Sequence, residues 1–233
     1  MSDEGIRLAK RVAETAACSR ADAERYIAGG WVSVDGDVID DPATRVLPAQ
    51  QVVLLPGATA EEPQPVTILL HKPAGLYGKA ALDSLQPETL FQVEHGPRFL
   101  KRHLTRLTPA MPLEAMASGL VVFSQDWRVV RKLVEDSKRI EQEYVAEVTG
   151  AIVEHGLARL NASGGPKTPI KASWQSEARL RFAGKGIEPG QIEALCAKVG
   201  LQVTALRRLR IGRIALSSLP LGQWRYLRDI ERF

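Results

Sequence analysis

The sequence predicts an α+β protein that is built from two unequal parts. A short first block, residues 1–56, contains two helix-like stretches followed by alternating strand-like segments. Residues 57–65 (GATAEEPQP) are rich in Gly, Ala, Glu and Pro, a composition that is typical of a linker. A longer second block, residues 66–233, adds apolar strands and a further helix. These observations together predict two domains joined by a linker.

The first block has local signals for two helices and a small sheet. Apolar residues recur at roughly helical spacing over about residues 6–16, and Ser19 stands where a helix N-cap would begin a second helix. Gly29 and Gly30 end that helix. WVSVDGDVI then alternates around an Asp-Gly pair, which is a strong β-hairpin pattern, and VVLLP supplies another strand. We therefore expect two helices packed on a small sheet.

The second block begins with VTILLHKPAGL, an apolar strand that ends in a turn forced by Pro and Gly. KRIEQEYVAEVTG is a second strand, with Tyr144, Ala146 and Val148 on one face. Asp126 is suited to cap a helix over WRVVRKLV. GQIEALCAKVG predicts a helix that is closed by Gly200, and two strands and an LPLGQWR turn follow it.

Composition excludes several classes of protein. The chain has 233 residues, 45% hydrophobic and 25% charged, and no apolar run is long enough to span a membrane. The N-terminal stretch lacks the pattern of a signal peptide. Cys18 and Cys196 form neither a disulfide framework nor a metal spacing, which favours a reducing, cytoplasmic location. No His pair, Cys cluster or Gly-rich phosphate loop indicates a metal or a nucleotide cofactor. No exposed apolar stripe is evident, so we expect a monomer.

The net charge of +4 is small, but the basic residues are clustered. One stretch contains Arg98, Lys101, Arg102, His103 and Arg106, and another contains Arg207, Arg208, Arg210 and Arg213. Such clusters suit a polyanionic partner, although ordinary solvated surface charge explains each stretch equally well.

The stretch IRLAKRVAETAACSRADAERYIAGGWVSVDGDVI resembles the small RNA-binding module named after ribosomal small-subunit protein S-four. The resemblance implies that its helices contact folded RNA through Arg7, Lys10, Arg11, Ser19, Arg20 and Arg25. The chemistry agrees, because Arg and Lys neutralise phosphates and a helix N-terminus offers free N–H donors. The block is nevertheless acidic, with nine Asp and Glu against six Lys and Arg. We therefore expect the acids to lie on the hairpin side.

Four further motifs, HKPAG, SGLVVFSQD, EYVAEVTG and LRRLRIGRIALSSLPLGQWRYL, follow in an order that resembles the RsuA-type pseudouridine synthases. The resemblance covers nearly the whole chain. It implies a mixed, mostly antiparallel sheet with flanking helices, and a cofactor-free isomerisation of uridine in structured ribosomal or transfer RNA. Basic residues that suit such an RNA are Lys72, Arg102, Arg106, Arg208 and Arg210. A solvated turn lysine is the alternative for Lys72, and we expect the strand arginines to be split between the two faces of the sheet.

The motif that carries catalysis in that family departs from its pattern here. The family has Gly-Arg-Leu-Asp, two variable residues and then Thr-Ser-Gly-Leu, where this chain has MPLEAMASGL (residues 111–120). Glu114 therefore stands at the catalytic aspartate, Pro112 at the arginine beside it, and Met111 at the glycine. The later family motif Gln-Ile-Arg-Arg-Met has become QIEAL, so Glu193 replaces an arginine. Tyr144 remains where the family places its active-site tyrosine.

These changes predict that catalysis is weak or lost. Glu is one methylene longer than Asp, and a misplacement of about 1 Å can cost roughly a hundredfold in rate. The alternative is an active synthase in which Glu114 still serves, with Arg106, Arg131 or Lys72 as a substitute cation. A paired Glu114 that faces Tyr144 across an open cleft would favour the enzyme, whereas an outward Glu114 or a filled cleft would favour an RNA-binding protein. Glu114 as a surface carboxylate and Tyr144 as a core tyrosine remain the plainer interpretations.

Overall fold

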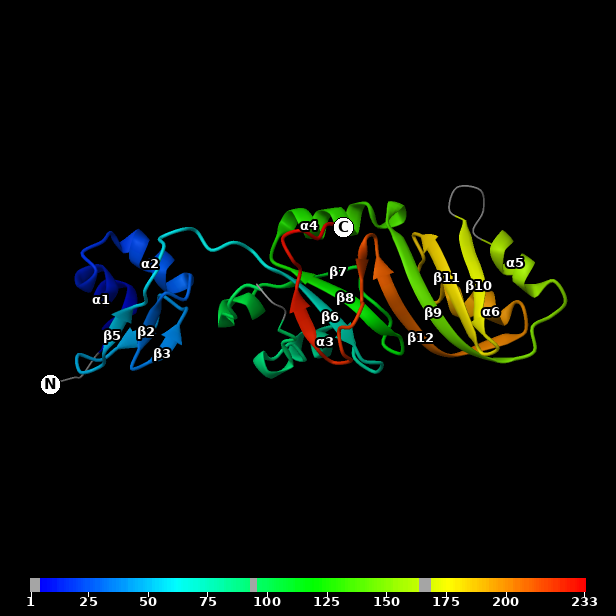
Figure 1. Ribbon diagram of the computed structural model, residues 1–233, viewed down its shortest axis with the longest axis horizontal. Helices are drawn as coiled ribbons and strands as arrows, with labels where there is room; N and C mark the ends of the chain where they lie inside the picture. The colour runs from blue at the N-terminus through cyan, green and yellow to red at the C-terminus, as the bar shows by residue number, and fades with distance from the viewer. Residues whose placement is uncertain (1–4, 93–95, 164–168) are drawn as a thin grey trace. The chain divides into compact units, whose positions relative to one another are not determined.

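The computed structural model describes residues 5–92, 96–163 and 169–233, and these divide into two compact units (Figure 1). Unit 1 consists of the described residues up to Pro65 together with Arg98–Arg106, and unit 2 consists of the described remainder. The first four residues of the predicted first domain lie outside the described residues. Segment 98–106 was predicted to belong to the second domain, but its contacts place it in unit 1.

Unit 1 contains two helices above short strands. Its elements are β1 (Ile6–Arg7), α1 (Leu8–Thr15), α2 (Arg20–Ala28), β2 (Val32–Val34), β3 (Asp37–Ile39), β4 (Arg45–Val46), β5 (Val52–Leu54) and the 3-10 turn η2 (Lys101–Leu104). Strands β3, β2 and β5 form one antiparallel sheet, and β1 pairs with β4. The predicted hairpin is confirmed, because Asp35 and Gly36 connect β2 to β3 with positive φ angles of 53° and 94°.

The helix starts of unit 1 follow from local chemistry. Ser19 caps α2, since its hydroxyl oxygen accepts a hydrogen bond from the backbone N–H of Asp22 at 3.1 Å. The first helix begins at Leu8 rather than at Ile6, because Ile6 and Arg7 extend to pair with β4. The inward faces of both helices pack with β2 and β4 into one core, which contains Leu8, Ala9, Val12, Ala23, Ile27, Val32, Val34 and Val46.

Unit 2 is built on a large sheet with helices packed on its strands. Its elements are β6 (Thr67–Lys72), α3 (Lys79–Asp83), η1 (Pro87–Thr89), β7 (Thr108–Ala110), β8 (Ser118–Ser124), α4 (Trp127–Glu135), η3 (Ser137–Arg139), β9 (Glu141–Gly150), α5 (Gly156–Ala162), β10 (Ile170–Ser176), β11 (Arg179–Lys185), α6 (Gln191–Ala197), β12 (Leu201–Ile211), β13 (Ile214–Ala215) and β14 (Trp224–Tyr226). The strand order is β10-β11-β9-β12-β8-β6-β14, with β13 beside β12 and β7 beside β8.

Only the β12–β8 pair is parallel among the pairings of the described strands, and the others are antiparallel. The predicted mixed, mostly antiparallel sheet is therefore confirmed. In unit 2, α4 packs on β7 and β8, whereas α5 packs on β10 and α6 on β12.

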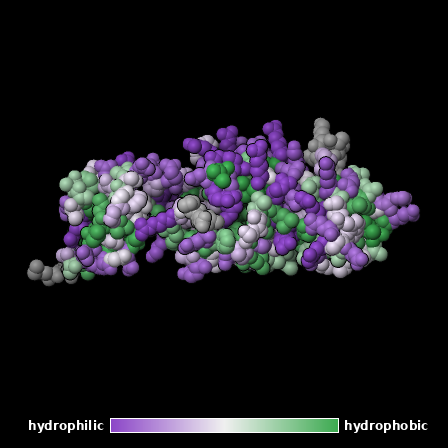
Figure 2. All heavy atoms as spheres, in the orientation of Figure 1, coloured by the Kyte–Doolittle hydropathy of each residue, from purple (hydrophilic) through white to green (hydrophobic). Residues whose placement is uncertain are grey.

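The visible surface carries hydrophilic side chains interspersed with small hydrophobic groups (Figure 2). Within the described part of the chain, no helix combines the length and the apolar character that crossing a membrane requires.

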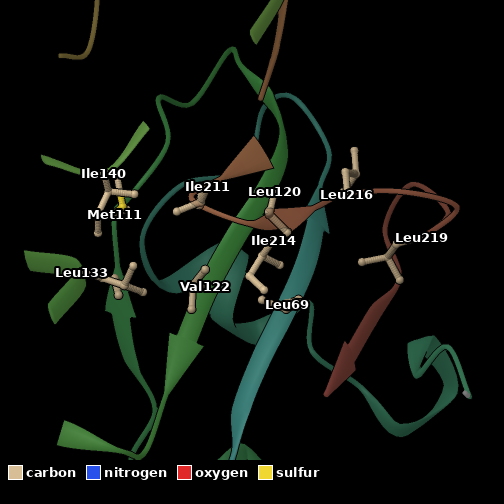
Figure 3. Packing of buried hydrophobic residues seen from close by; sticks show 11 residues of the cluster. Leu69, Met111, Leu120, Val122, Leu133, Ile140, Ile211, Ile214, Leu216 and Leu219 are labelled. Carbon is tan, nitrogen blue, oxygen red and sulfur yellow. The ribbon is translucent and has the colours of Figure 1, made fainter. Parts of the chain in front are cut away.

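The core of unit 2 fixes the loop that contains the altered motif. Leu69 of β6, Leu120 of β8 and Ile211 of β12 are fully buried, and Leu133 of α4 covers them (Figure 3). Met111, the first residue of the loop, buries its side chain in the same cluster. Its backbone has a φ of +52°, which a side chain tolerates poorly and glycine tolerates well. That conformation supports aligning Met111 with the glycine of the family motif.

Candidate active site

Residues 111–117 connect β7 to β8, and the first four of them form one wall of a cavity of about 200 Å³. Glu114 lies in that wall, and Tyr144 of β9 and Arg208 of β12 line the cavity with it. Tyr144 and Arg208 are partners in the antiparallel β9–β12 ladder, so their side chains share one face of the sheet. The fold thus brings Glu114 and Tyr144, the two residues predicted to act in catalysis, to one cavity.

Tyr144 is held by a polar network inside the sheet. Its hydroxyl donates a hydrogen bond to Oε1 of Gln142 at 2.8 Å, and Nη1 of Arg208 donates to the same oxygen at 3.2 Å. Burial raises the pKa of Tyr144, while the positive charge of Arg208 acts in the opposite direction. The hydroxyl of Tyr144 therefore stays protonated at neutral pH, and what Tyr144 can offer a ligand in the cavity is its ring.

Arg208 is fully buried, and its guanidinium holds the altered loop through hydrogen bonds to main-chain carbonyls. Its Nη2 donates to the carbonyl of Met111 at 2.6 Å, and its Nε donates to the carbonyl of Leu120 at 2.8 Å. A longer contact of 3.5 Å joins Nη1 to the carbonyl of Pro112. This corrects the expectation that Arg208 contacts RNA, because only 1% of its surface is exposed and its donors already have partners.

Lys72 has a similar role from the other side of the loop. Its ammonium donates to the carbonyls of Pro73, Leu76 and Ala115 at 3.0, 2.8 and 3.2 Å. Burial, reinforced by repulsion from Arg208, lowers the pKa of Lys72 to about 8. The structure therefore corrects both expectations for Lys72, since a side chain with 1% exposure is neither a solvated turn lysine nor a phosphate contact.

Glu114 has a backbone hydrogen-bond partner. Its Oε1 accepts a hydrogen bond from the N–H of Gly190, the residue before α6, at 2.6 Å. No ion pair joins it to a cation within the described ranges of the chain. Of the three substitute cations considered, Lys72 interacts with Glu114, because the negative charge of Glu114 acts to raise the pKa of Lys72. Arg131 instead pairs with Glu135 on α4, and Arg106 belongs to unit 1.

Glu193 brings a second carboxyl group close to Glu114. It lies in the first turn of α6, and its Oε2 is buried without a hydrogen-bond partner among the described residues. Burial raises the pKa of Glu193, and the negative charge of Glu114 raises it further. Two carboxyl groups therefore lie where the family motif pairs one carboxylate with an arginine.

Arg210 lies elsewhere and already has acidic partners. Its Nε donates to Glu143 at 3.1 Å, and its Nη2 pairs with Glu141. Arg210 is partly exposed and already paired with two acids, so its contact with RNA stays a prediction. The predicted division of the strand arginines does hold, since Arg207 is exposed whereas Arg208 is buried.

The predicted RNA-contact residues of unit 1 are distributed over its two helices. Arg7, Lys10 and Arg20 line one groove of about 580 Å³, and Arg45 of β4, which the sequence did not indicate, lines it too. Arg11 and Arg25 are not among the residues lining that groove. Arg25 pairs with Asp22 on its own helix, and Ser19 serves as the cap of α2.

Segment 98–106 uses its arginines inside unit 1. Nη1 of Arg98 donates to the carbonyl of Gly30 at 3.1 Å, and Nη1 of Arg102 donates to the carbonyl of Ala28 at 3.2 Å. The backbone N–H of Arg102 also donates to Asp40 at 2.8 Å. These contacts satisfy carbonyls at the C-terminal end of α2. Arg102 is half-buried and Arg106 is exposed, and the contact of either residue with RNA stays a prediction.

Sequence reasoning missed Gln142 and Gly190 as parts of the site. Gln142 precedes Tyr144 by two residues on one strand, so the period of a strand could have indicated it. Gly190 carried no such signal, because its N–H meets Glu114 across 76 residues. No cluster of His, Cys, Asp and Glu that could hold a metal ion occurs among the residues that the structure describes.

Comparison with known proteins agrees with this architecture. The S4 domain model matches residues 6–52. The dual-specificity RNA pseudouridine synthase RluF of Escherichia coli is 29% identical over 244 residues, which cover 99% of this chain and 78% of that protein. An uncharacterized RNA pseudouridine synthase of Mycobacterium bovis is 30% identical over 249 residues, which cover 97% of this chain and 91% of that protein.

A solved structure has the same fold. The crystal structure of a pseudouridylate synthase superposes with a TM-score of 0.57 at 19% identity, covering 96% of each chain. An S4 domain followed by this sheet defines an RNA-binding protein with a pseudouridine synthase fold. The chain belongs to the RNA pseudouridine synthase family, and the resemblance found from its motifs is confirmed.

Proposed function

We propose that this chain binds structured ribosomal or transfer RNA and that its isomerisation step is weak or lost. The observation that carries the proposal is the electrostatic state of the cavity. Glu114 accepts a hydrogen bond from Gly190 but has no ion-pair partner among the described residues, and Glu193 adds a second carboxyl group. The family motif places arginines at Pro112 and Glu193, where they would keep the catalytic carboxylate ionised and oriented.

One observation favours the alternative, an active synthase that uses Glu114. The cavity is open, and Glu114 and Tyr144 both line it, as a synthase requires. A flipped uridine could be held there by stacking and hydrogen bonds. The position of Glu114 therefore satisfies one half of the geometric criterion for the enzyme. The other half, an ion-pair partner for Glu114, is not met among the residues that the structure describes.

Tritium release from RNA labelled at C5 of uridine distinguishes the two, because isomerisation attaches the sugar to C5 and expels its hydrogen. We expect the wild-type chain to release tritium at least about a hundredfold more slowly than an active family member, with no further loss in Glu114→Ala. Ribosomal and transfer RNA are both tested. Release by the wild type that disappears in Glu114→Ala would establish the active synthase instead.

A gain-of-function variant makes the test sharper. Glu114→Asp combined with Glu193→Arg restores the shorter carboxylate and one arginine, so release should rise above that of the wild type. Glu193→Arg alone is the matched control, since it changes the charge without the carboxylate length. RNA affinity, measured by filter binding, should change little in Glu114→Ala.

A further inference from the structure

The solvent-facing side of α4 carries a stripe that the cavity does not use. Trp127, Arg131 and Val134 follow one another at spacings of four and three residues, so they share one face of the helix. Trp127 is 63% exposed and Val134 is 55% exposed, whereas Leu133 on the opposite face is fully buried. A small hydrophobic group bordered by hydrophilic side chains is visible where Figure 1 draws α4 (Figure 2).

The stripe forms one side of a groove of about 290 Å³, which we call the α4 groove. It is lined by Thr108, Ser124, Gln125, Trp127, Val130, Arg131, Val134 and Glu135. The groove therefore combines an exposed indole ring with polar side chains from the ends of β7 and β8. Such a combination suits a ligand that has a flat apolar face and polar edges.

The segment that carries the α4 groove is basic overall, although the charged residues lining the groove itself are Arg131 and Glu135. Residues 126–139 contain five Lys and Arg against three Asp and Glu, a net charge of +2. These residues are Arg128, Arg131, Lys132, Lys138 and Arg139 against Asp126, Glu135 and Asp136. Arg131 pairs with Glu135 at 2.9 Å, but both side chains are 61% exposed, and such a pair contributes little and exchanges readily. Arg131 is therefore available to a phosphate.

The α4 groove is continuous in sequence with the rim of the cavity. Helix α4 is followed directly by η3, and Ser137 and Lys138 of η3 line the cavity that contains Glu114. The nine residues of α4 span about 14 Å at 1.5 Å per residue. A nucleic acid strand that leaves the cavity past Lys138 can therefore follow α4 towards Trp127.

We propose that the α4 groove binds a single-stranded stretch of RNA beside the nucleotide held in the cavity, with one base stacked on Trp127 and a phosphate on Arg131. This rests on the RNA binding in the proposed function, but not on the loss of catalysis. Single-strand binding sites combine basic side chains with aromatic rings in this way. The net positive charge of residues 126–139 matches a polyanion better than it matches an apolar protein surface.

The test measures the affinity of the full chain for a fluorescein-labelled oligouridylate by anisotropy. Trp127→Ala should weaken binding about tenfold, because base–aromatic stacking is of that order. Trp127→Phe should retain most of the affinity, and Trp127→Leu should lose it, since leucine is apolar but does not stack. Trp174→Ala on β10 is the matched control for an exposed tryptophan, and circular dichroism checks that each variant is folded.

Three results would overturn the proposal. The first is wild-type affinity in Trp127→Ala, and the second is failure of the wild-type chain to bind oligouridylate. The third is full affinity in Trp127→Leu together with Trp127-dependent self-association in sedimentation, which would make the groove a contact between copies. Failure of the RNA-binding part of the proposed function is recognised separately, because the wild type would then also fail to bind ribosomal and transfer RNA.

Discussion

At the scale of single residues, the candidate site depends on two buried cations that serve main-chain carbonyls. Arg208 holds the start of the altered loop at Met111, and Lys72 holds it further on at Ala115. Neither cation has an acidic partner in these contacts, so the carbonyl dipoles must offset the cost of desolvation. The position of Glu114 therefore depends on residues that do not touch its carboxylate.

The first prediction concerns Arg208→Met, which keeps the volume of the side chain and removes its donors. The carbonyls of Met111 and Leu120 would lose buried partners, and each unsatisfied group costs about 1–3 kcal/mol. We expect the free energy of unfolding to fall by about 3 kcal/mol in urea denaturation. Arg207→Met is the control, and its effect should stay within about 0.5 kcal/mol because Arg207 is exposed. Equal losses in both variants would contradict this role for Arg208.

Sequence alone could find Glu114 and Tyr144 but not the cations that support them. The motif alignment located the first two, because the spacing to Ser118-Gly119-Leu120 is local. Lys72 and Arg208 were expected to be accessible, since Lys and Arg are rarely buried without an acidic partner. The carbonyls that Arg208 contacts are 88 and 97 residues away, and Lys72 adds to two nearby carbonyls that of Ala115, which is 43 residues away, so no local pattern predicts their burial.

At the scale of elements, segment 98–106 is the part of the structure that departs most from the sequence-based boundaries. It leaves unit 2 after Pro97, packs on unit 1 and returns at Leu107. Leu100 and His103 are its buried side chains. The hairpin at Asp35-Gly36 and the Ser19 cap were predictable because neighbouring residues determine them. The docking of this segment depends on residues about 60 to 75 positions away, as its hydrogen bonds to Ala28, Gly30 and Asp40 show.

The second prediction follows from the pKa of His103. Burial, reinforced by the charge of Arg102 and opposed by that of Asp40, lowers this pKa from 6.5 to about 4. Because the folded-state pKa lies below the unfolded one, the stabilisation is fully present above pH 6.5 and is lost as the pH falls towards 4. We expect the docked segment to lose roughly 2 kcal/mol of stability between pH 7 and pH 5.

Amide hydrogen exchange of residues 98–106, followed by mass spectrometry and corrected for intrinsic rates, measures that loss. In His103→Gln the pH dependence should be much smaller, since glutamine does not titrate. His71→Gln is the control, because His71 is also a buried histidine with a lowered pKa but lies in unit 2. Identical pH profiles for the wild type and His103→Gln would show that other groups control the docking of the segment.

At the scale of the whole molecule, each unit carries a surface suited to RNA. In unit 1 the groove contains Arg7, Lys10 and Arg20, although the predicted first domain is acidic in total. Of its acids, Asp35 and Asp37 lie at the hairpin and Asp40 contacts segment 98–106. The expectation that the acids lie on the hairpin side is wrong for Glu14 on α1 and for Asp22 and Glu24 on α2. The groove itself nevertheless has four cations, Arg45 included, against one acid, Glu14. The local arrangement of charge therefore decides the partner better than the sum of charges does.

The last prediction separates RNA affinity from the chemistry of the cavity. In Lys10→Gln combined with Arg20→Gln, two cations leave the groove of unit 1, and their own partners, Glu14 and Glu24, are exposed pairs that contribute little to stability. Each lost phosphate contact should reduce the slope of log K against log salt by about 1, so the double variant should lose roughly 2. Filter binding to transfer RNA over a series of salt concentrations measures the slope.

Arg179→Gln on β11 is the matched control for an exposed, paired arginine. Both Arg179→Gln and Glu114→Ala should keep the wild-type slope. A double variant with an unchanged slope would mean that unit 1 contributes no phosphate contacts through these residues, and that the affinity for RNA resides in other residues.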